Sequence, residues 1–231
     1  MRILFVRHGE PDYATDSLTE TGKEQARLVA ERLLRENITE IYASSMYRAT
    51  QTAAPLAEKL GLDVTVLPYM HEIAWGSKEG RELPMRGHPW FLAETLLNEG
   101  YVPTDDNWRE HDYFRDNLAT DLLDVISTQI DELIAAHGFT RTGRLYKVAD
   151  DVTPGKTIAL FSHGGSGASA LSHILNIPYP YIMAAMPYQF TSVTAVTFPD
   201  MPGKTVFPRL SLFNDVGHLS LAPEKKPTFD R

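Results

Sequence analysis

The chain has 231 residues, with 22 lysines and arginines against 30 aspartates and glutamates, so its formal net charge at pH 7 is −8. It contains no cysteine, which excludes disulfide scaffolds, cysteine-ligated metal centres and cysteine nucleophiles. The acidic balance argues against a nucleic-acid partner, and no apolar run is long enough for a membrane span. Length and composition predict one cytoplasmic domain, residues 1–231, that buries a sizeable core.

The first third of the chain alternates between predicted strands and helices. Residues 3–6 form a short apolar run typical of a buried strand, and a helical apolar stripe follows over 20–37. A second strand is expected at 40–43, a second helix at 45–60 and a third strand at 63–67. This alternation predicts an α/β fold of three layers, α/β/α, around a central and mainly parallel sheet.

Residues 73–115 interrupt the alternation. They hold all three tryptophans and show little periodicity, so we interpret them as an insertion that forms a lid or faces the substrate. Helical spacing resumes between Leu118 and Ile134. A buried strand at 157–162 and a small-residue helix at 166–175 are expected next.

Two further strands, 191–198 and 206–213, predict an antiparallel hairpin at an edge of the sheet. The oligomeric state is not written in the sequence, but such an edge is a candidate for pairing in a homodimer. The tail from Pro223 is expected to be a loosely held end.

Two predicted strands end in a histidine followed by a glycine. The first ends in Phe5-Val6-Arg7-His8-Gly9, and the strand at 157–162 ends in Phe161-Ser162-His163-Gly164. Ligands bind outside the carboxyl ends of strands in open α/β sheets, and neighbouring strands lie ~4.8 Å apart. We therefore expect the two histidines to meet over one site, although a single histidine of this kind is more often structural.

Two chemistries suit such a pair of histidines. Imidazoles bind zinc-like ions, but His71-Glu72 is followed by Ile-Ala-Trp, so no His-Glu-x-x-His motif is present. The other chemistry is that of anions: Arg7 and Arg48 would bind a phosphate with their guanidinium groups while a histidine attacks phosphorus. For Arg48 alone, a solvated charge on a helix is the ordinary alternative.

These residues form part of a series of motifs that resembles the histidine phosphatase superfamily, the phosphoglycerate-mutase-like phosphatases. The matching motifs are Arg7-His8-Gly9-Glu10-Pro11, Leu18-Thr19-Glu20-x-Gly22, Ala43-Ser44-Ser45-x-x-Arg48-Ala49-x-Gln51-Thr52-Ala53, His71-Glu72-Ile73-x-x-Gly76-x-x-Glu79-Gly80 and Ser162-His163-Gly164-Gly165. They fall within residues 2–80 and 157–176, in the family's order. Arg-His-Gly alone would be weak evidence, whereas the five motifs together are strong.

The resemblance implies a role for each matched residue. His8 would be the nucleophile that becomes phosphohistidine. Glu72 would protonate the leaving oxygen and then activate water, which requires a carboxyl group that is protonated near neutral pH. The residues that would surround the phosphoryl oxygens are Arg7, Arg48, His163, Gly9 and Gly164. Of these, Arg7, Arg48 and His163 would also stabilise the transition state. The implied mechanism needs neither a metal nor an organic cofactor.

The implied reaction is hydrolysis of a small phosphorylated metabolite. Mutase members of the family carry an asparagine six residues beyond the nucleophile, where this chain has Ala14, and their basic segment is not recognisable in 73–115. Both differences favour a phosphatase over a mutase, which remains one alternative; a catalytically idle, phosphate-binding regulatory module is another. The candidate substrate contacts in the insertion are Arg81, Arg86, His88, Trp90, Arg109 and His111.

A serine hydrolase is the competing enzyme class. Gly164-x-Ser166 resembles a nucleophile elbow, with Asp200 or Asp215 and then His218 downstream in the order of an α/β-hydrolase triad. However, Ala168 stands where the closing glycine of that motif belongs, and this interpretation leaves the Arg-His-Gly motif without a role.

Overall fold

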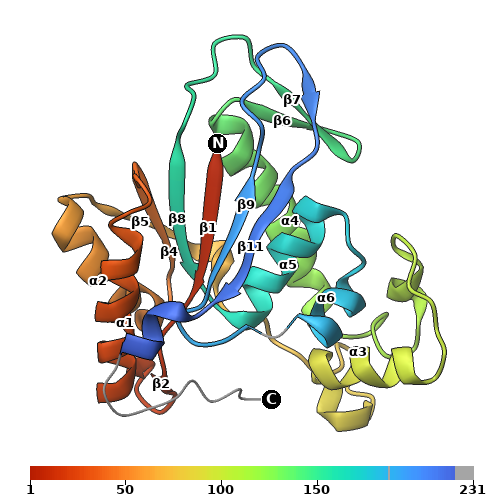
Figure 1. Ribbon diagram of the computed structural model, residues 1–231. Coiled ribbons are helices and arrows are strands. Elements are labelled where there is room, and N and C mark those ends of the chain that lie inside the picture. Colours follow the sequence, from red (N-terminus) through yellow and green to blue (C-terminus); the bar gives the residue numbers. More distant parts are fainter. Residues whose placement is uncertain (187, 222–231) are drawn as a thin grey trace.

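The computed structural model describes residues 1–186 and 188–221, and the expected loose tail from Pro223 lies outside these ranges. A six-stranded sheet forms the centre of the molecule, in the order β11-β9-β1-β8-β4-β5 (Figure 1). Its parallel strands are β1 (Arg2–Arg7), β8 (Thr157–Ser162), β4 (Glu40–Ser44) and β5 (Val64–Leu67). At one edge, β9 (Val193–Thr197) and β11 (Arg209–Asp215) are antiparallel to their neighbours. The predicted sheet is confirmed.

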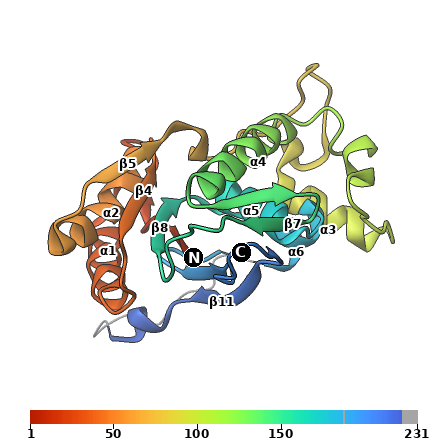
Figure 2. The same ribbon diagram turned by 90° about the horizontal axis from the view of Figure 1, so that it is seen from above.

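Helices cover both faces of this sheet, as Figure 2 shows from above. They are α1 (Glu20–Leu33), α2 (Tyr47–Leu60), α4 (Ala119–Ala136) and α5 (Gly164–Leu175). Because successive strand residues point to opposite faces, Ile3 and Phe5 pack with α4 and α5, whereas Leu4 and Val6 pack with α1 and α2. The alternation produces the two cores of the predicted three-layer fold. Among the described residues, no helix is long and apolar enough to cross a membrane.

The segment 73–115 contains three short helices. They are the 3-10 turns η2 (Pro84–Gly87) and η3 (Asn107–Glu110) and the helix α3 (Pro89–Asn98). The expectation of little periodicity is wrong for α3, because its buried residues Pro89, Leu92, Ala93 and Leu96 follow helical spacing. A third apolar cluster packs α3 against α6 (Tyr179–Ala185), another helix that the sequence patterns did not indicate. Figure 1 shows both helices at the end of the sheet where the parallel strands finish.

A small three-stranded sheet lies at the opposite end of the molecule. The hairpin of β6 (Phe139–Thr142) and β7 (Leu145–Val148) was not expected, and β10 (Thr205–Val206) pairs with β7. The expected strand over 206–213 is therefore divided, since Val206 joins this sheet while β11 begins at Arg209. The expected antiparallel pairing with the preceding strand is confirmed for β9 and β11.

Candidate active site

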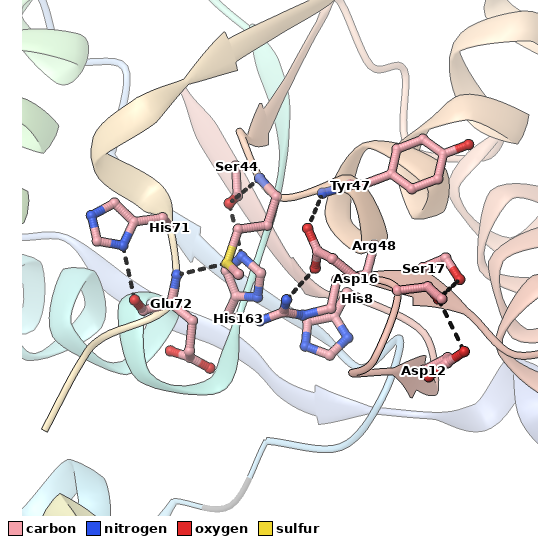
Figure 3. A network of polar contacts seen from close by, with 12 residues as sticks. His8, Asp12, Asp16, Ser17, Ser44, Tyr47, Arg48, His71, Glu72 and His163 are labelled. Atoms are coloured by element: carbon pink, nitrogen blue, oxygen red, sulfur yellow. Dashed lines mark hydrogen bonds and ion pairs between the residues drawn. The ribbon is translucent and has the colours of Figure 1, made fainter.

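The carboxyl ends of β1 and β8 bring the two strand-end histidines together. Arg7 pairs in register with Ser162, so His8 and His163 follow one residue later on neighbouring strands. The backbone N–H of His8 donates to the carbonyl oxygen of Ser162 at 2.9 Å, and the two imidazole centroids lie 5.0 Å apart. The meeting expected from the sequence is thus present (Figure 3).

His8 is held as a neutral imidazole with a defined tautomer. Its ring is buried, and its Nδ1 lies 2.7 Å from the carbonyl oxygen of Gly9. Because a carbonyl oxygen only accepts hydrogen bonds, Nδ1 carries the proton and Nε2 keeps its lone pair. Burial and the nearby guanidinium groups of Arg7 and Arg48 lower the pKa of His8 from 6.5 to about 3. At neutral pH the Nε2 atom of His8 therefore keeps a lone pair that is free to react.

His163 is fully buried at the position that precedes α5. Its Nε2 lies 2.8 Å from the hydroxyl of Ser44, the last residue of β4. Its buried Nδ1 faces the backbone N–H of Ser166 at the start of α5, but no close hydrogen bond satisfies it within the described part of the chain. Burial, together with His8 and the two arginines, lowers the pKa of His163, so this ring is also neutral.

Arg48 lies in the first turn of α2 and is buried. It forms an ion pair with Asp16, whose other carboxylate oxygen accepts the backbone N–H of Tyr47 at 2.8 Å. Asp16 lies in the turn between two short strands, β2 (Pro11–Asp12) and β3 (Ser17–Leu18). Figure 3 shows the Arg48 guanidinium between Asp16 and the ring of His8. The Nε of Arg48 is buried and, within the described residues, unpartnered, so this arginine can donate a further hydrogen bond.

The segment that precedes β9 covers another side of the site. The Phe190 ring lies 5.6 Å from the His8 ring and 4.3 Å from the Arg7 guanidinium carbon, and Arg7 also donates to the carbonyl oxygen of Tyr188. Thr191 is buried with a φ of 56°, which is rare for a β-branched residue. Its backbone N–H donates to the carbonyl oxygen of Arg7 at 3.0 Å. These contacts hold Phe190 against the histidine.

Glu72 follows β5 and the 3-10 turn η1 (Pro68–Met70), and it reaches the first turn of α5. Its Oε1 accepts the backbone N–H groups of Ile73 at 2.9 Å, Gly165 at 3.0 Å and Ser166 at 3.3 Å. Burial raises the pKa of Glu72, while these N–H groups and the two arginines oppose that shift. A Cβ on Gly165 would lie 2.6 Å from the same Oε1, so only glycine permits this contact.

The two glycines expected beside the phosphate differ in their surroundings. A Cβ on Gly9 would lie 2.6 Å from the carbonyl oxygen of Gly22, so Gly9 is required for close packing against the first turn of α1. A Cβ on Gly164 would make only ordinary contacts, at 3.5 Å from Trp90 and 3.8 Å from Arg7. Gly164 therefore lines the space between these two side chains, whereas Gly9 acts through backbone packing.

Comparisons with known proteins decide the family. Residues 3–139 match the family model described as the histidine phosphatase superfamily (branch 1). The chain belongs to this superfamily. A probable phosphoglycerate mutase GpmB from Yersinia enterocolitica is 25% identical over 234 residues, which cover 96% of each chain. A putative phosphoserine phosphatase 2 from Hydrogenobacter thermophilus is 29% identical over 153 residues, 60% of this chain and 74% of the relative.

Solved structures share the fold of this histidine phosphatase. A mycobacterial glucosyl-3-phosphoglycerate phosphatase in complex with inorganic phosphate matches with a TM-score of 0.64 and 24% identity, over 94% of this chain and 98% of the other. A phosphoserine phosphatase from Entamoeba histolytica matches with a TM-score of 0.63 and 21% identity, over the same shares. The α/β/α fold expected from the sequence is confirmed by these likenesses.

The five residues expected to carry out the reaction lie in one cluster, which we call the strand-end cluster. Its members are His8, His163, Arg7, Arg48 and Glu72, and each ends or follows a parallel strand. Sequence reasoning missed the partners that hold them: Asp16, Ser44, Phe190 and Gly165. Only Ser44 and Gly165 had a signal, since both lie inside motifs that resemble the family's.

The candidate contacts of the insertion separate into two groups. Trp90 lies beside Gly164, and His88 lies 5.1 Å from Trp90 between ring centroids. The other candidates are engaged elsewhere: Arg81 pairs with Asp116, Arg109 with Asp106 and Asp124, His111 contacts the rings of Tyr101 and Tyr113, and Arg86 lines a surface groove formed by residues 76–86.

The residues of the serine-hydrolase alternative do not assemble into a triad. The hydroxyl of Ser166 donates to the carbonyl oxygen of Met70 at 3.0 Å, whereas Nε2 of His218 lies 3.1 Å from the hydroxyl of Thr191. Asp200 pairs with the N-terminal ammonium group, and Asp215 pairs with Arg32. The nucleophile-elbow interpretation is therefore wrong for this chain.

Proposed function

We propose that this histidine phosphatase hydrolyses small phosphomonoesters through a phosphohistidine on His8. One observation carries the proposal. The neutral Nε2 nucleophile of His8 lies beside two buried nitrogen atoms that lack partners among the described residues, Nδ1 of His163 and Nε of Arg48. A phosphoryl group has three oxygens that accept hydrogen bonds, so a bound phosphoryl group would be a hydrogen-bond partner for both nitrogen atoms.

The first step is phosphoryl transfer to the enzyme. Nε2 of His8 attacks phosphorus, a P–N bond forms, and the P–O bond of the ester breaks. Arg7, Arg48 and His163 stabilise the charge on the equatorial oxygens. For His163 to donate from Nδ1, its Nε2 must accept the hydroxyl proton of Ser44, and the 2.8 Å contact permits this.

Glu72 supplies the proton for the leaving oxygen. Burial raises the pKa of Glu72, which favours the protonated carboxyl group, and because Oε1 accepts three backbone N–H groups, the acidic proton belongs on Oε2. After the first step, Glu72 is a carboxylate. It then takes a proton from a water molecule that attacks phosphorus, the P–N bond breaks, and inorganic phosphate leaves.

Phosphate release tests this function directly. A panel of metabolite phosphomonoesters in EDTA, with 4-nitrophenyl phosphate as a generic substrate, should be hydrolysed by the wild type and not by His8→Ala. Circular dichroism of the variant controls for folding. Retained turnover in a folded His8→Ala variant would overturn the proposal. His8-dependent transfer of phosphate between hydroxyl groups without net release would support the mutase alternative instead.

The proposal also includes the single domain, the cytoplasmic location and the homodimer expected from the sequence. We treat 1–231 as one catalytic domain in which 73–115 is the insertion that faces the substrate, in a cytoplasmic enzyme. β11 lies at the open edge of the sheet with Leu210 exposed, which supports pairing of two copies through this strand. Light scattering of the purified chain would give twice the monomer mass if the homodimer forms, and the monomer mass if it does not.

A further inference from the structure

Four aromatic side chains of the insertion form a continuous surface, which we call the aromatic wall: Trp75, His88, Trp90 and Phe91. The ring centroid of His88 lies 4.7 Å from that of Trp75, 5.1 Å from that of Trp90 and 4.9 Å from that of Phe91. Trp75 meets Trp90 edge-on at 6.4 Å. These separations fall in the range of favourable aromatic pairs, so the four rings support one another.

The aromatic wall adjoins the strand-end cluster. A Cβ placed on Gly164 would contact the Trp90 ring at 3.5 Å and the Arg7 guanidinium at 3.8 Å, so these two groups face each other across one glycine. Trp75 follows Glu72, the proposed acid, by three residues in the chain. Oε1 of Glu72 contacts Gly165, the neighbour of the glycine that Trp90 contacts, so the leaving alcohol that Glu72 protonates extends beside the wall.

Two rings of the wall, Trp75 and Phe91, are exposed although they are large and apolar, and His88 and Trp90 are half-buried between them. Trp75 is 40% exposed and Phe91 is 44% exposed, whereas Trp108, the third tryptophan of the same segment, is 2% exposed in the core. A contiguous apolar surface beside a reaction centre typically binds a ligand. Burial lowers the pKa of His88, so at neutral pH this ring is also uncharged.

The cations of the insertion are poorly placed to bind a carboxylate. Four of its five lysines and arginines form ion pairs with aspartates: Lys78 with Asp121, Arg81 with Asp116, Arg109 with Asp106 and Asp124, and Arg115 with Asp112. The fifth, Arg86, lines the groove of residues 76–86, which does not include any member of the strand-end cluster. Within residues 73–115, each cation that could bind the carboxylate of a phosphorylated acid is thus paired with an aspartate or lines a different groove.

We propose that the enzyme selects phosphomonoesters of alcohols that carry a flat, uncharged ring, which packs against Trp75 and Trp90 while the phosphate enters the strand-end cluster. This inference rests on the proposed phosphatase function and specifies its substrate class. Small phosphorylated acids are poor substrates in this arrangement, because their carboxylate meets aromatic rings instead of a cation.

The test compares esters of primary alcohols, so that the leaving groups differ in shape and charge more than in basicity. The probes are benzyl phosphate, cyclohexylmethyl phosphate, glycerol 3-phosphate and 3-phosphoglycerate. The wild type should show a kcat/KM for benzyl phosphate that exceeds the value for 3-phosphoglycerate by about tenfold or more, the scale of discrimination by one apolar pocket. Equal values, or a preference for 3-phosphoglycerate or for the puckered cyclohexylmethyl ester, would overturn the inference.

Variants of the wall identify the residues responsible. Trp75→Ala and Trp90→Ala should each lower the ratio of kcat/KM for benzyl phosphate over glycerol 3-phosphate by about tenfold, whereas Trp90→Phe should keep most of it. Phe207→Ala is the matched control. It removes an exposed aromatic ring next to β10, which pairs with β7 at the far end of the molecule, and should leave the ratio unchanged. An unchanged ratio in both tryptophan variants would overturn the inference.

A binding measurement separates this inference from the proposed function. Benzylphosphonate and methylphosphonate cannot be hydrolysed, and calorimetry of the wild type should show tighter binding of benzylphosphonate by about tenfold, with the difference lost in Trp90→Ala. If no ester is hydrolysed but this difference is present, the proposed function fails and the aromatic selectivity stands. If esters are hydrolysed through His8 but the two phosphonates bind equally, the selectivity fails alone.

Discussion

The strand-end cluster and the insertion differ in the kinds of side chains that form them and in how exposed those side chains are. The cluster consists of buried and half-buried polar groups whose positions follow from strand register and backbone hydrogen bonds, such as His8 and His163 on paired strands. The insertion presents exposed rings and ion pairs on short helices and turns, such as Trp75 and the pair of Arg81 with Asp116. Changes to the cluster should therefore affect every substrate, and changes to the insertion should affect substrates selectively.

The largest effect expected in the strand-end cluster, apart from loss of the nucleophile, is that of Glu72→Gln. The amide oxygen still accepts the backbone N–H groups, but the side chain no longer transfers a proton, so kcat for alkyl phosphates should fall by about 10²–10⁴-fold. With 4-nitrophenyl phosphate the loss should be smaller, because that leaving group departs without protonation. Because Glu72 also activates water in the second step, the comparison uses kcat/KM, which reports phosphoryl transfer to the enzyme. Equal losses of kcat/KM for the two esters would contradict the role of Glu72 as the acid.

Adjacent glycines sharpen the comparison within the cluster. Gly165→Ala places a Cβ against Oε1 of Glu72 and against Ile73, so kcat should fall by at least tenfold, and stability should fall by about 1–3 kcal/mol. Gly164→Ala is the matched control, since its Cβ meets Trp90 and Arg7 at ordinary distances. Gly164→Ala should change the ratio of kcat/KM for benzyl phosphate over glycerol 3-phosphate more than it changes the free energy of unfolding. Similar losses of stability in both variants would contradict the close contact at Gly165.

The buried histidines predict a stability that depends on acid pH. The folded pKa of His8 is about 3 and that of His218 is about 4, both below the usual 6.5. The unfolded chain therefore binds more protons between these values and pH 6.5, so the stability they contribute is present above pH 6.5 and is lost as pH falls. Urea unfolding at several pH values should show this loss, and the free energy of unfolding should depend less steeply on pH in His8→Gln than in the wild type. An equally steep dependence on pH in the variant would contradict a depressed pKa at His8.

The smallest effect is expected at Asp16, whose carboxylate is partly exposed. Asp16→Asn keeps an acceptor for the N–H of Tyr47 but removes a negative charge that competes with phosphate for Arg48. Inhibition by inorganic phosphate should tighten by about two- to fivefold, a modest change because solvent screens the pair. Weaker inhibition would show instead that Asp16 positions Arg48 for phosphate binding.

The part of the site that follows from strand ends could be predicted from the sequence. His8 and His163 were expected together because each ends a buried strand, and parallel register then sets their separation. The contacts of Asp16 and Phe190 could not be foreseen, since they depend on the turn between β2 and β3 and on the segment between α6 and β9 rather than on periodicity. Thr191 illustrates the difficulty, because a β-branched residue gives no sign of the positive φ that it adopts beside Phe190.

The fold shows a similar division. Long periodic segments such as 118–134 were identified as helix, and α4 spans Ala119–Ala136. Short elements were missed, among them the four-residue strands β6 and β7, because so few residues carry little periodic signal. The helical spacing of α3 was present in the sequence but obscured by the polar and aromatic residues around it.

Capture of the covalent intermediate tests the central claim most directly. The wild type, mixed with a hydrolysable ester and quenched in alkali within the first turnover, should carry the mass of one phosphoryl group on the peptide that contains His8, and acid should remove it. Glu72→Gln should accumulate more of this species with 4-nitrophenyl phosphate, since its hydrolysis lacks a base. An active wild type with no phosphoryl group on His8 under either condition would contradict the mechanism.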